Sequence, residues 1–412
     1  MTGTPSPGTP EFLRAHNDRA ALGLFITHGT LTRTRLGELT GLSKVTASQM
    51  VERLTTRGLI RTLGTDDDGK RGPKAKVYAL DPRCAHVMAA ELTPDGLAIA
   101  CADITGAIVS RATVRFEEAP DPLATAHAAV EAAAKEAGLD VSAIDGIVIG
   151  TPGVIDPLTG EAGYTSDLPT WTGRLRAELR TASGKPVQLA NDVNLAAVAE
   201  AQAGAAVGQP DFALFWIGRG VGLATVVGGR VLRGAHGAAG ELGYLPVPGC
   251  EVPRNPARPE VRGGMQSLIG AEAVLRLAAE HGIEAGDAAE AVRSAVEKVA
   301  AAEPAAGAAG LPIEGSRSSG GRSFLDELGR RIALGVAACC AIMDPPLVVL
   351  AGPIGTTGGE LLADIVHRET TAITLAGPDI VPTETTDAPV LQGALFLALD
   401  STRKRLLDSI AE

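Results

Sequence analysis

A polar stretch near the middle of the chain, 191-NDVN-194, combines carboxamides with a carboxylate directly before an Ala-rich segment. Asn191 and Asp192 could form hydrogen bonds with the hydroxyl groups of a small molecule. Asp192 could instead act as a general base on such a hydroxyl. Taken alone, the stretch is also what a structural turn contains, so its meaning depends on the motifs around it.

Three glycine-rich turns accompany this stretch. The first, 150-GTPGVID-156, follows an apolar run, and Gly153 there would let the main chain approach a ligand closely. The second, 218-GRGVG-222, lies between two apolar runs and could cradle a phosphate, although one such turn is weak evidence. The third, 236-HGAAGELGY-244, places Glu241 among glycines. The order and spacing of the motifs together predict a ligand site.

A different chemistry is predicted for 33-RTRLGELTGLSKVTASQMVERLTTRGLI-60. Its apolar residues fit the inward face of a helix-turn-helix: Leu36, Leu39, Leu42, Val45, Met50, Val51 and Leu54. Its polar residues then face solvent or DNA: Ser43, Lys44, Thr46, Ser48, Gln49 and Arg53. Short polar side chains at the start of such a helix can reach base edges in the major groove. The alternative is a three-helix domain whose polar face is only solvated.

The stretch 69-GKRGPKAK-76 would form the tip of a β-hairpin directly after these helices. Lys70, Arg71 and Lys74 at such a tip could neutralise phosphates or enter a narrow minor groove. A solvated basic turn is the alternative reading.

The elements that must position these N-terminal residues can be read from periodicity and turn residues. Apolar residues at helical spacing begin near Phe12 and end at Gly29, and a short helix is expected over 35–40. Ser43 is a good N-cap for a third helix over 44–57. Strands are expected over 59–63 and 76–80. We therefore expect a disordered tail over 1–10 and a winged helix-turn-helix over 11–81.

The remainder, 82–412, reads as α/β because strand-like runs over 86–92, 97–104 and 144–150 alternate with helical segments such as 122–137. A low-complexity stretch over about 300–322 is expected to be a mobile insert.

Composition and charge limit the class of protein. The chain has 412 residues, enough for two or three domains, and its five cysteines form no C-x-x-C pair. The longest apolar run, 332–343, is too short to span a bilayer, and no signal peptide is expected, which favours a cytoplasmic protein. Residues 11–80 hold 12 Lys and Arg against 7 Asp and Glu, a net +5, whereas the other residues hold 25 and 41, a net −16. A basic segment on an acidic body is typical of a DNA-binding module on a carrier.

The order of these motifs resembles that of the ROK family, which comprises repressors, open reading frames and sugar kinases. The resemblance runs from about Arg14 to the C-terminus and includes 344-DPPLVVLAGPIG-355 and 392-QGALFLAL-399. It implies a winged helix-turn-helix followed by a two-lobed, actin-like ATPase fold, with lobe one at about 82–195 plus 392–412 and lobe two at about 196–391. It also implies that the effector binds in the cleft between the two lobes. By motif match, the residues facing a sugar would be Gly153, Asn191, Asp192 and Glu241, with Asp192 in the place of the kinase base.

The chain departs from the kinase pattern at the phosphate-binding turn. Family kinases carry an Asp-x-Gly-Gly-Thr turn whose amides hold ATP phosphates, whereas this chain has 91-ELTPD-95. Pro94 has no amide hydrogen, and Asp95 would repel phosphate. We therefore expect no enzymatic activity.

It also departs from the family's zinc site. Tyr244 replaces the zinc-binding His, Cys250 is the one cysteine left in the loop, and Gly264 replaces the last cysteine. Zinc needs about four nitrogen or sulfur ligands, so we expect no metal and no cofactor. Gln266 stands where the family has a sugar-binding Glu, and Tyr244 and Gln266 are kept as candidate ligand contacts because of the positions that they occupy.

These observations predict a ligand-responsive transcriptional regulator, expected to repress carbohydrate-related genes. Its partners would be a double-stranded DNA operator with an inverted repeat and a sugar or sugar derivative, bound by a homodimer or homotetramer away from any membrane. Two alternatives stay open. Asp192 favours a sugar kinase with an attached DNA-binding domain, and the altered Tyr244 and Gln266 favour a regulator that is switched by a protein partner and has a vestigial pocket.

Overall fold

The computed structural model describes residues 9–65, 75–117, 119–163, 171–252, 254, 264–307, 320–375 and 377–410. The chain forms two units. The first comprises Met1–Ile149, Thr170–Gln188 and Ala394–Glu412, and the second comprises Gly150–Pro169 and Leu189–Gly393. Within the described residues, no helix combines the length and apolar character that crossing a membrane requires.

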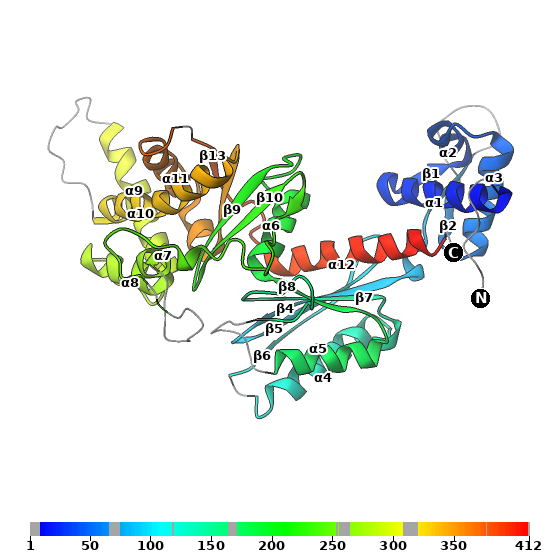
Figure 1. Ribbon diagram of the computed structural model, residues 1–412, viewed down its shortest axis with the longest axis horizontal. Coiled ribbons are helices and arrows are strands. Elements are labelled where there is room, and N and C mark those ends of the chain that lie inside the picture. Colours follow the sequence, from blue (N-terminus) through cyan, green and yellow to red (C-terminus); the bar gives the residue numbers. More distant parts are fainter. Residues whose placement is uncertain are drawn as a thin grey trace. The chain divides into compact units, whose positions relative to one another are not determined.

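The first unit begins with three helices and a small antiparallel sheet, which we call the N-terminal module (Figure 1). The sheet has the strand order β1-β3-β2. The elements are α1 (Pro10–His28), β1 (Thr30–Thr32), α2 (Arg33–Thr40), α3 (Lys44–Thr56), β2 (Ile60–Thr65) and β3 (Lys76–Leu80). The helices and the two longer strands lie where the sequence predicts them. Strand β1 was not predicted, because three residues carry too little periodicity to indicate a strand. The predicted tip residues Lys70, Arg71 and Lys74 lie outside the described residues.

The turn between α2 and α3 follows from local side-chain chemistry. Gly41 ends α2 in the left-handed conformation, with φ 69°, and Ser43 begins α3 by accepting a hydrogen bond from the amide of Thr46 at 3.2 Å. One inward residue was predicted wrongly. The Val45 side chain is 67% exposed, and Ala47 takes the inward position with Met50, Val51 and Leu54.

The core of the N-terminal module also contains residues from the far end of the chain. Ile410 is buried in the same hydrophobic cluster as Leu22, Phe25 and Leu54, and Leu406 and Leu407 pack against it. Two polar contacts accompany this packing: Arg19 lies 2.5 Å from Asp408, and Arg57 donates to the carbonyl oxygen of Ser409 at 3.3 Å. The predicted domain 11–81 therefore lacks part of the core that it has in the whole chain.

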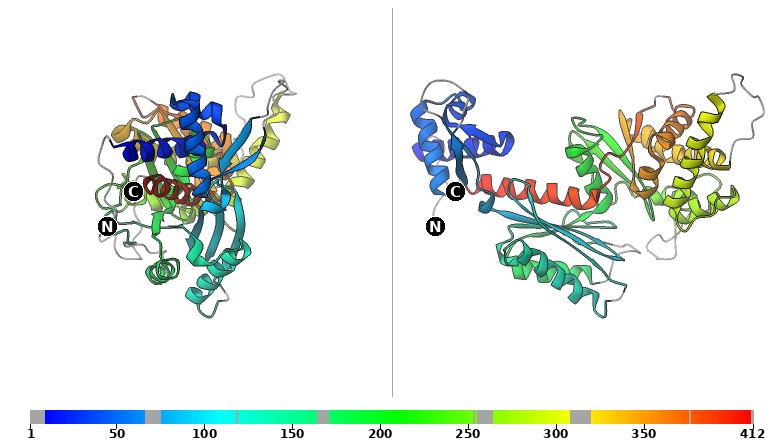
Figure 2. Two further views of the ribbon diagram at one scale, coloured as in Figure 1. Left: turned by 90° about the vertical axis from the view of Figure 1, so that its right-hand side faces the viewer. Right: turned by 180° about the vertical axis from the view of Figure 1, so that it is seen from behind.

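The rest of the first unit is a five-stranded sheet with the order β6-β5-β4-β7-β8. Helices α4 and α5 lie on one face of this sheet and α12 lies on the other (Figures 1 and 2). The elements are β4 (His86–Thr93), β5 (Gly96–Asp103), β6 (Ile108–Arg115), α4 (Pro122–Glu136), β7 (Gly146–Thr151), α5 (Thr172–Ser183), β8 (Val187–Asn191) and α12 (Pro389–Asp408).

Helix α12 is pinned to this sheet by its polar side chains. Arg403 donates to the carbonyl of Ile104 at 2.8 Å, and Arg405 donates to the carbonyl of Asp145 at 2.7 Å. Gly146 faces the helix, and a Cβ there would lie 2.6 Å from the Thr402 hydroxyl oxygen, so only glycine permits this approach. The division between the units passes through α12, which therefore belongs to both.

The second unit contains a five-stranded sheet with the order β11-β10-β9-β12-β13 and helices on both faces. Alternate residues of β9 face opposite sides, as the two-residue period of a strand requires. Phe212 and Leu214 pack in the cluster with α6, whereas Ala213, Phe215 and Ile217 pack in the larger cluster of the other helices. The elements are α6 (Asp192–Ala203), β9 (Phe212–Ile217), β10 (Val221–Val227), β11 (Arg230–Val231), α7 (Gly264–Ile269), α8 (Ala271–Glu280), α9 (Ala288–Gly307), α10 (Gly320–Met343), β12 (Leu347–Ala351), α11 (Gly352–Thr371) and β13 (Asp379–Pro382).

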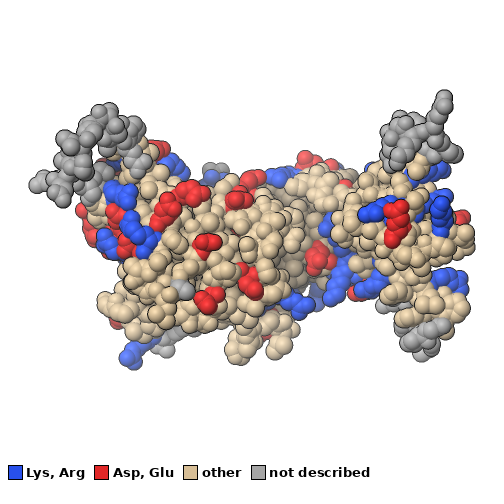
Figure 3. Space-filling model, turned by 90° about the horizontal axis from the view of Figure 1, so that it is seen from above, with Lys and Arg blue, Asp and Glu red and all other residues tan. Residues whose placement is uncertain are grey.

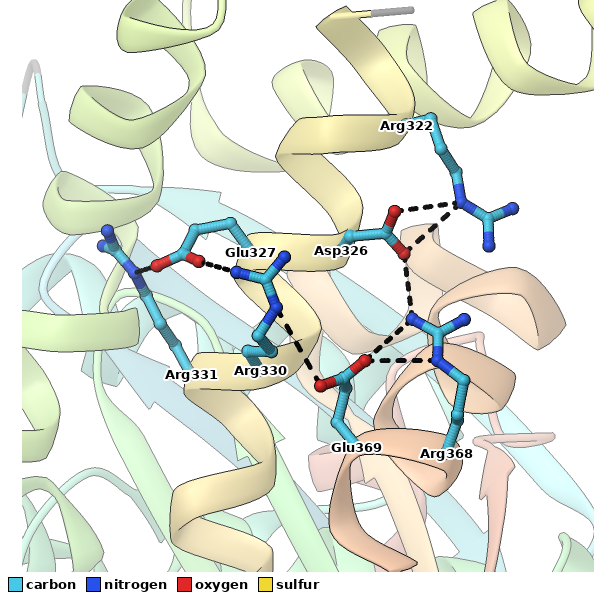
Figure 4. Close-up of polar contacts among 7 residues, drawn as sticks. All are labelled: Arg322, Asp326, Glu327, Arg330, Arg331, Arg368 and Glu369. Atoms are coloured by element: carbon cyan, nitrogen blue, oxygen red, sulfur yellow. Dashed lines mark hydrogen bonds and ion pairs between the residues drawn. The ribbon is translucent and has the colours of Figure 1, made fainter. Parts of the chain in front are cut away.

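A chain of ion pairs links α10 to α11 in this unit (Figure 4). Asp326 forms ion pairs with Arg322 at 3.2 Å and with Arg368 at 3.0 Å. Glu369 forms ion pairs with Arg368 at 2.8 Å and with Arg330 at 3.9 Å. Shared charges of this kind hold two helices in register more firmly than isolated surface pairs do.

Two predicted boundaries differ from the structure. The insert predicted at 300–322 begins and ends in helix, because α9 extends to Gly307 and α10 starts at Gly320, and residues 308–319 lie outside the described residues. The segments 150–169 and 189–195, which were assigned to lobe one, fall in the second unit. The order of the strands along the sequence does not show which segments pack together in space, so it could not predict the bounds of the two units.

Replacing Ile410 should weaken the N-terminal module, although the residue lies at the opposite end of the chain. Ile410→Ala removes a side chain that is 4% exposed and should cost about 2–5 kcal/mol of unfolding free energy. Amide hydrogen exchange of α1 and α3 measures the effect locally. Ile342→Ala is the matched control, because that side chain is 79% exposed and its loss should change stability by less than about 0.5 kcal/mol. Unchanged exchange in Ile410→Ala would contradict the shared core.

Candidate functional site

All six residues predicted to contact a ligand lie in the second unit. Asn191 is the N-cap of α6, and its side-chain oxygen accepts from the amide of Asn194 at 2.9 Å. Its amide nitrogen donates to the carbonyl of Gly153 at 3.2 Å. Asn191 thus joins the turn that follows β7 to the start of α6, and it brings two of the predicted motifs together.

Asp192 and Glu241 form the electrostatic centre of the candidate ligand site. Burial raises the pKa of the Glu241 carboxyl, and the nearby negative charge of Asp192 raises this pKa further. An Asp192 carboxylate oxygen accepts from the amide of Val193 at 2.8 Å. When both are ionised, the two carboxylates can only accept hydrogen bonds, so a ligand with several hydroxyl donors would suit them.

Glycine holds Glu241 close to this position. Gly240 has φ +91°, and a Cβ there would lie 1.8 Å from the carbonyl oxygen of Leu223 in β10. Leu223 in turn donates its amide to the carbonyl of Gly240 at 2.8 Å. The chain can therefore approach β10 only with glycine at 240, and this contact sets the position of the carboxylate that follows.

Gln266, a predicted ligand contact, uses its side chain to hold a turn of the main chain. Its oxygen accepts from the amide of Val221 at 2.9 Å, and its nitrogen donates to the carbonyl of Arg219 at 2.7 Å. These bonds fix the glycine-rich turn 218–222 between β9 and β10. Tyr244 ends a short 3₁₀ helix, Leu242–Tyr244, directly after Glu241. A ligand contact by Gln266 or Tyr244 stays a prediction.

The turn between β4 and β5, in the first unit, stands where family kinases bind the phosphates of ATP, so the availability of its main-chain amides matters. The Thr93 hydroxyl oxygen accepts from the amide of Gly96 at 3.2 Å, and Pro94 has no amide hydrogen. Phe116 donates its amide to the carbonyl of Asp95 at 2.9 Å. Pro94 therefore offers no amide to a phosphate, and the Gly96 amide is already used within the turn.

Glu200, which was not among the predicted site residues, holds the C-terminal end of α6 in place. This carboxylate is fully buried, and it accepts hydrogen bonds from the amide and hydroxyl of Thr385 at 3.0 and 2.5 Å and from the amide of Ala205 at 2.7 Å. It ties the end of α6 to the chain after β13, while Asn191 and Asp192 lie at the start of the same helix. Its signal in the sequence is an acidic residue within the Ala-rich part of α6, eight residues after Asp192.

The described residues contain no group of three or more His, Cys, Asp or Glu side chains that could hold a metal ion. Residues 253 and 255–263, in the loop that aligns with the family's zinc site, are not described. Burial raises the pKa of the Cys84 thiol to about 11 and that of Cys339 to about 12, so neither thiol is a ready nucleophile near neutral pH.

The predicted DNA-contacting residues of α3 divide into two groups. The Ser43 and Thr46 hydroxyls lie 2.9 Å apart and hydrogen-bond to each other, and Ser43 also caps the helix. Lys44 and Gln49 are exposed and Ser48 is half-buried. Base contacts by any of these residues stay predictions, but the hydroxyls of Ser43 and Thr46 already have a structural role.

Arg53, the sixth of these residues, forms a bidentate ion pair with Asp18 of α1, at 2.8 and 2.6 Å. The hydrogen bond to Asp18 raises the pKa of the Arg53 guanidinium. Because the Asp18 side chain is only 7% exposed, the pair braces α1 against α3. Asp18 shares the helical spacing of the buried Ala21, Leu22 and Phe25, and this spacing is its signal in the sequence.

Several basic side chains are scattered over the surface of the N-terminal module in the view of Figure 3. Those that are exposed in the described residues are Arg14, Arg33, Arg35, Lys44, Arg57, Arg61 and Lys76. Such a surface attracts a polyanion at long range.

The two lobes and their motifs define a class, the α/β proteins with an actin-like ATPase fold, and the comparisons identify the family. The ROK family model matches residues 91–401, and the chain belongs to this family. A xylose repressor of Caldicellulosiruptor bescii is 23% identical over 243 residues, 58% of this chain and 61% of that protein. A glucokinase of Halalkalibacterium halodurans is 27% identical over 221 residues, 53% of this chain and 64% of that protein.

The similar solved structures also include both regulators and sugar kinases of the family. A ROK family transcriptional regulator, a homologue of the E. coli MLC protein, has a TM-score of 0.71 at 19% identity, and the match covers 97% of this chain and 99% of that one. A ROK family glucokinase from Streptomyces griseus has a TM-score of 0.59 at 20% identity and covers 77% of this chain and 100% of its own. At these identities the matches show the fold alone.

The raised pKa of Glu241 predicts a pH-dependent effect of Glu241→Gln. When a carboxyl has a higher pKa in the folded than in the unfolded state, the folded state binds more protons, so stability falls as pH rises through that pKa. The variant lacks this penalty. It should therefore melt at a higher temperature than the wild type at pH 8, and the difference should vanish near pH 4. Glu384→Gln serves as control for a second-unit glutamate with no assigned role in the site. A pH-independent difference would contradict the raised pKa of Glu241.

The Asp18–Arg53 pair should show a measurable coupling energy. A double-mutant cycle with Asp18→Asn and Arg53→Gln should give about 1–2 kcal/mol of coupling in the free energy of unfolding, because the carboxylate is buried. The exposed pair Arg35–Glu38, each 58% exposed, should give less than about 1 kcal/mol. Equal coupling in the two cycles would contradict the bracing role of Arg53.

Proposed function

We propose that this protein is a transcriptional regulator that binds DNA through its N-terminal module and responds to a small, hydroxyl-rich ligand in its second unit. The observation that carries the proposal is the extent of the fold matches. The regulator fold covers 97% of this chain, the N-terminal module included, whereas the glucokinase fold covers 77%. The exposed polar face of α3 and the basic surface of the module support DNA as its partner.

A repressor of carbohydrate-related genes is the specific form of the proposal. The xylose repressor among the relatives supports it, and so does the pair of carboxylates at Asp192 and Glu241, which suits a polyol. The operator would be an inverted repeat read by a homodimer or homotetramer, because two identical modules related by a two-fold axis read the two half-sites identically.

A ligand can change operator affinity only if it binds two conformations of the protein with different affinity. Helix α12 offers a physical route for such a response. It begins in the second unit, runs as one helix from Pro389 to Asp408, and is followed by Ile410 in the core of the N-terminal module.

Sugar phosphorylation is the second candidate function, favoured by the glucokinase relatives and by Asp192 at the position of the kinase base. We propose that the chain does not transfer phosphate. Phosphate transfer depends on groups that stabilise the charge of the phosphates. In the turn after Thr93, Pro94 has no amide hydrogen and the Gly96 amide is already bonded to the Thr93 hydroxyl oxygen.

The test uses the full chain. Bound sequences are selected from random double-stranded DNA, and affinity is then measured with and without each of a panel of sugars and sugar phosphates. Arg71→Ala and Lys74→Ala should each lower the slope of log affinity against log salt by about one unit. Asp192→Asn should keep DNA affinity but weaken the response to the active sugar by about 10- to 100-fold.

Asp364→Asn is the matched control, because this aspartate is exposed on α11 and should leave both properties unchanged. A coupled assay for ADP release runs in parallel. Sugar-dependent ADP release that is lost in Asp192→Asn would make the kinase reading correct. If the chain selects no DNA sequence, the proposed role as a transcriptional regulator is refuted.

A further inference from the structure

One residue of α3 has a side chain whose position no packing role explains. The buried residues of this helix, Ala47, Met50, Val51 and Leu54, define its inward face. Successive residues of a helix are 100° apart, so Val45 lies almost opposite the centre of that face. Its side chain is 67% exposed, and among the described residues it is not part of the hydrophobic cluster of the N-terminal module.

The outward stripe that contains Val45 is otherwise polar. Gln49, Glu52 and Thr56 follow it at helical spacing, and all three are exposed. Valine is a poorer helix former than alanine, because its branched side chain loses rotamer freedom. An exposed valine in the first turn of α3 therefore gains nothing in helix stability or in core packing.

The polar groups around Val45 narrow what this turn of α3 can contact. The hydroxyls of Ser43 and Thr46 hydrogen-bond to each other and cap the helix. Lys44 and Gln49 are exposed on either side of Val45. A partner that contacts the start of α3 would thus meet the long polar side chains of Lys44 and Gln49, with the branched apolar side chain of Val45 between them.

The major groove offers one prominent apolar group to such a surface. Each base pair presents hydrogen-bond donors and acceptors there, and only thymine adds a C5-methyl group. The first residues of the second helix of a helix-turn-helix are the ones that reach base edges. An exposed valine in this turn therefore matches thymine and no other base.

We propose that Val45 contacts the C5-methyl group of a thymine in each half-site and so specifies that base. This inference rests on the DNA-binding function proposed above. It adds an apolar specificity contact to the polar residues Lys44, Ser48 and Gln49, and it makes the operator dependent on a methyl group.

The experiment replaces each thymine of a selected DNA duplex, one at a time, by deoxyuridine, which lacks only the C5-methyl group. The full chain should bind about fourfold more weakly when the thymine facing Val45 is replaced, the effect of losing contact with one methyl-sized group. For Val45→Ala, the thymine and deoxyuridine duplexes should bind equally. Val45→Ile should retain the preference, because it keeps the branched apolar group.

Val207→Ala is the matched control, since this valine is 60% exposed in the second unit and its loss should leave the deoxyuridine effect unchanged. Melting temperatures measured in parallel should be equal for the wild type and all variants. Selected DNA that is insensitive to deoxyuridine at every thymine overturns the inference and leaves the regulator intact. A fourfold effect that persists in Val45→Ala also overturns it. A chain that selects no DNA sequence refutes the proposed function and this inference with it.

Discussion

Ile410, Leu406 and Leu407 complete a hydrophobic core whose other members come mostly from the first eighty residues. The N-terminal module depends on this packing, because without it Leu22, Phe25 and Leu54 would lose part of their buried surroundings. The same C-terminal segment continues α12, which is pinned to β7 and to the loop after β5. The two ends of the chain thus share one hydrophobic core in the first unit.

In the second unit, several polar side chains that could have bound a ligand instead form hydrogen bonds that fix the position of the main chain. Asn191 joins the turn at Gly153 to α6, Gln266 holds the turn 218–222, and Glu200 ties the end of α6 to Thr385. Asp192 and Glu241 are the pair whose charges repel each other. A ligand that donates hydrogen bonds to both carboxylates would relieve that repulsion, which is a physical reason for such a ligand to bind.

A similar division applies to the helix proposed to read DNA. Arg53 braces α1 against α3 through Asp18, and the Ser43 and Thr46 hydroxyls form the cap that starts α3. These contacts fix the helix that presents Lys44, Val45 and Gln49 to solvent. Rigid support of this kind lets a few side chains discriminate between bases, because the helix loses little conformational freedom on binding.

The sequence by itself determined two kinds of feature. These are the helices and longer strands of the N-terminal module and the Ser43 cap, which depend on neighbouring residues, and the α/β class and the ROK family, which depend on the order of elements and motifs along the chain. The tertiary structure alone decided contacts between distant residues: Arg53 with Asp18 across 35 positions, Gln266 with Arg219 across 47, Glu200 with Thr385 across 185 and Arg57 with Ser409 across 352. Periodicity shows that a residue is polar or apolar but not which distant group it meets. For the same reason Val45 was assigned to the core: its apolar character is visible in the sequence, whereas its direction is set by how α3 packs.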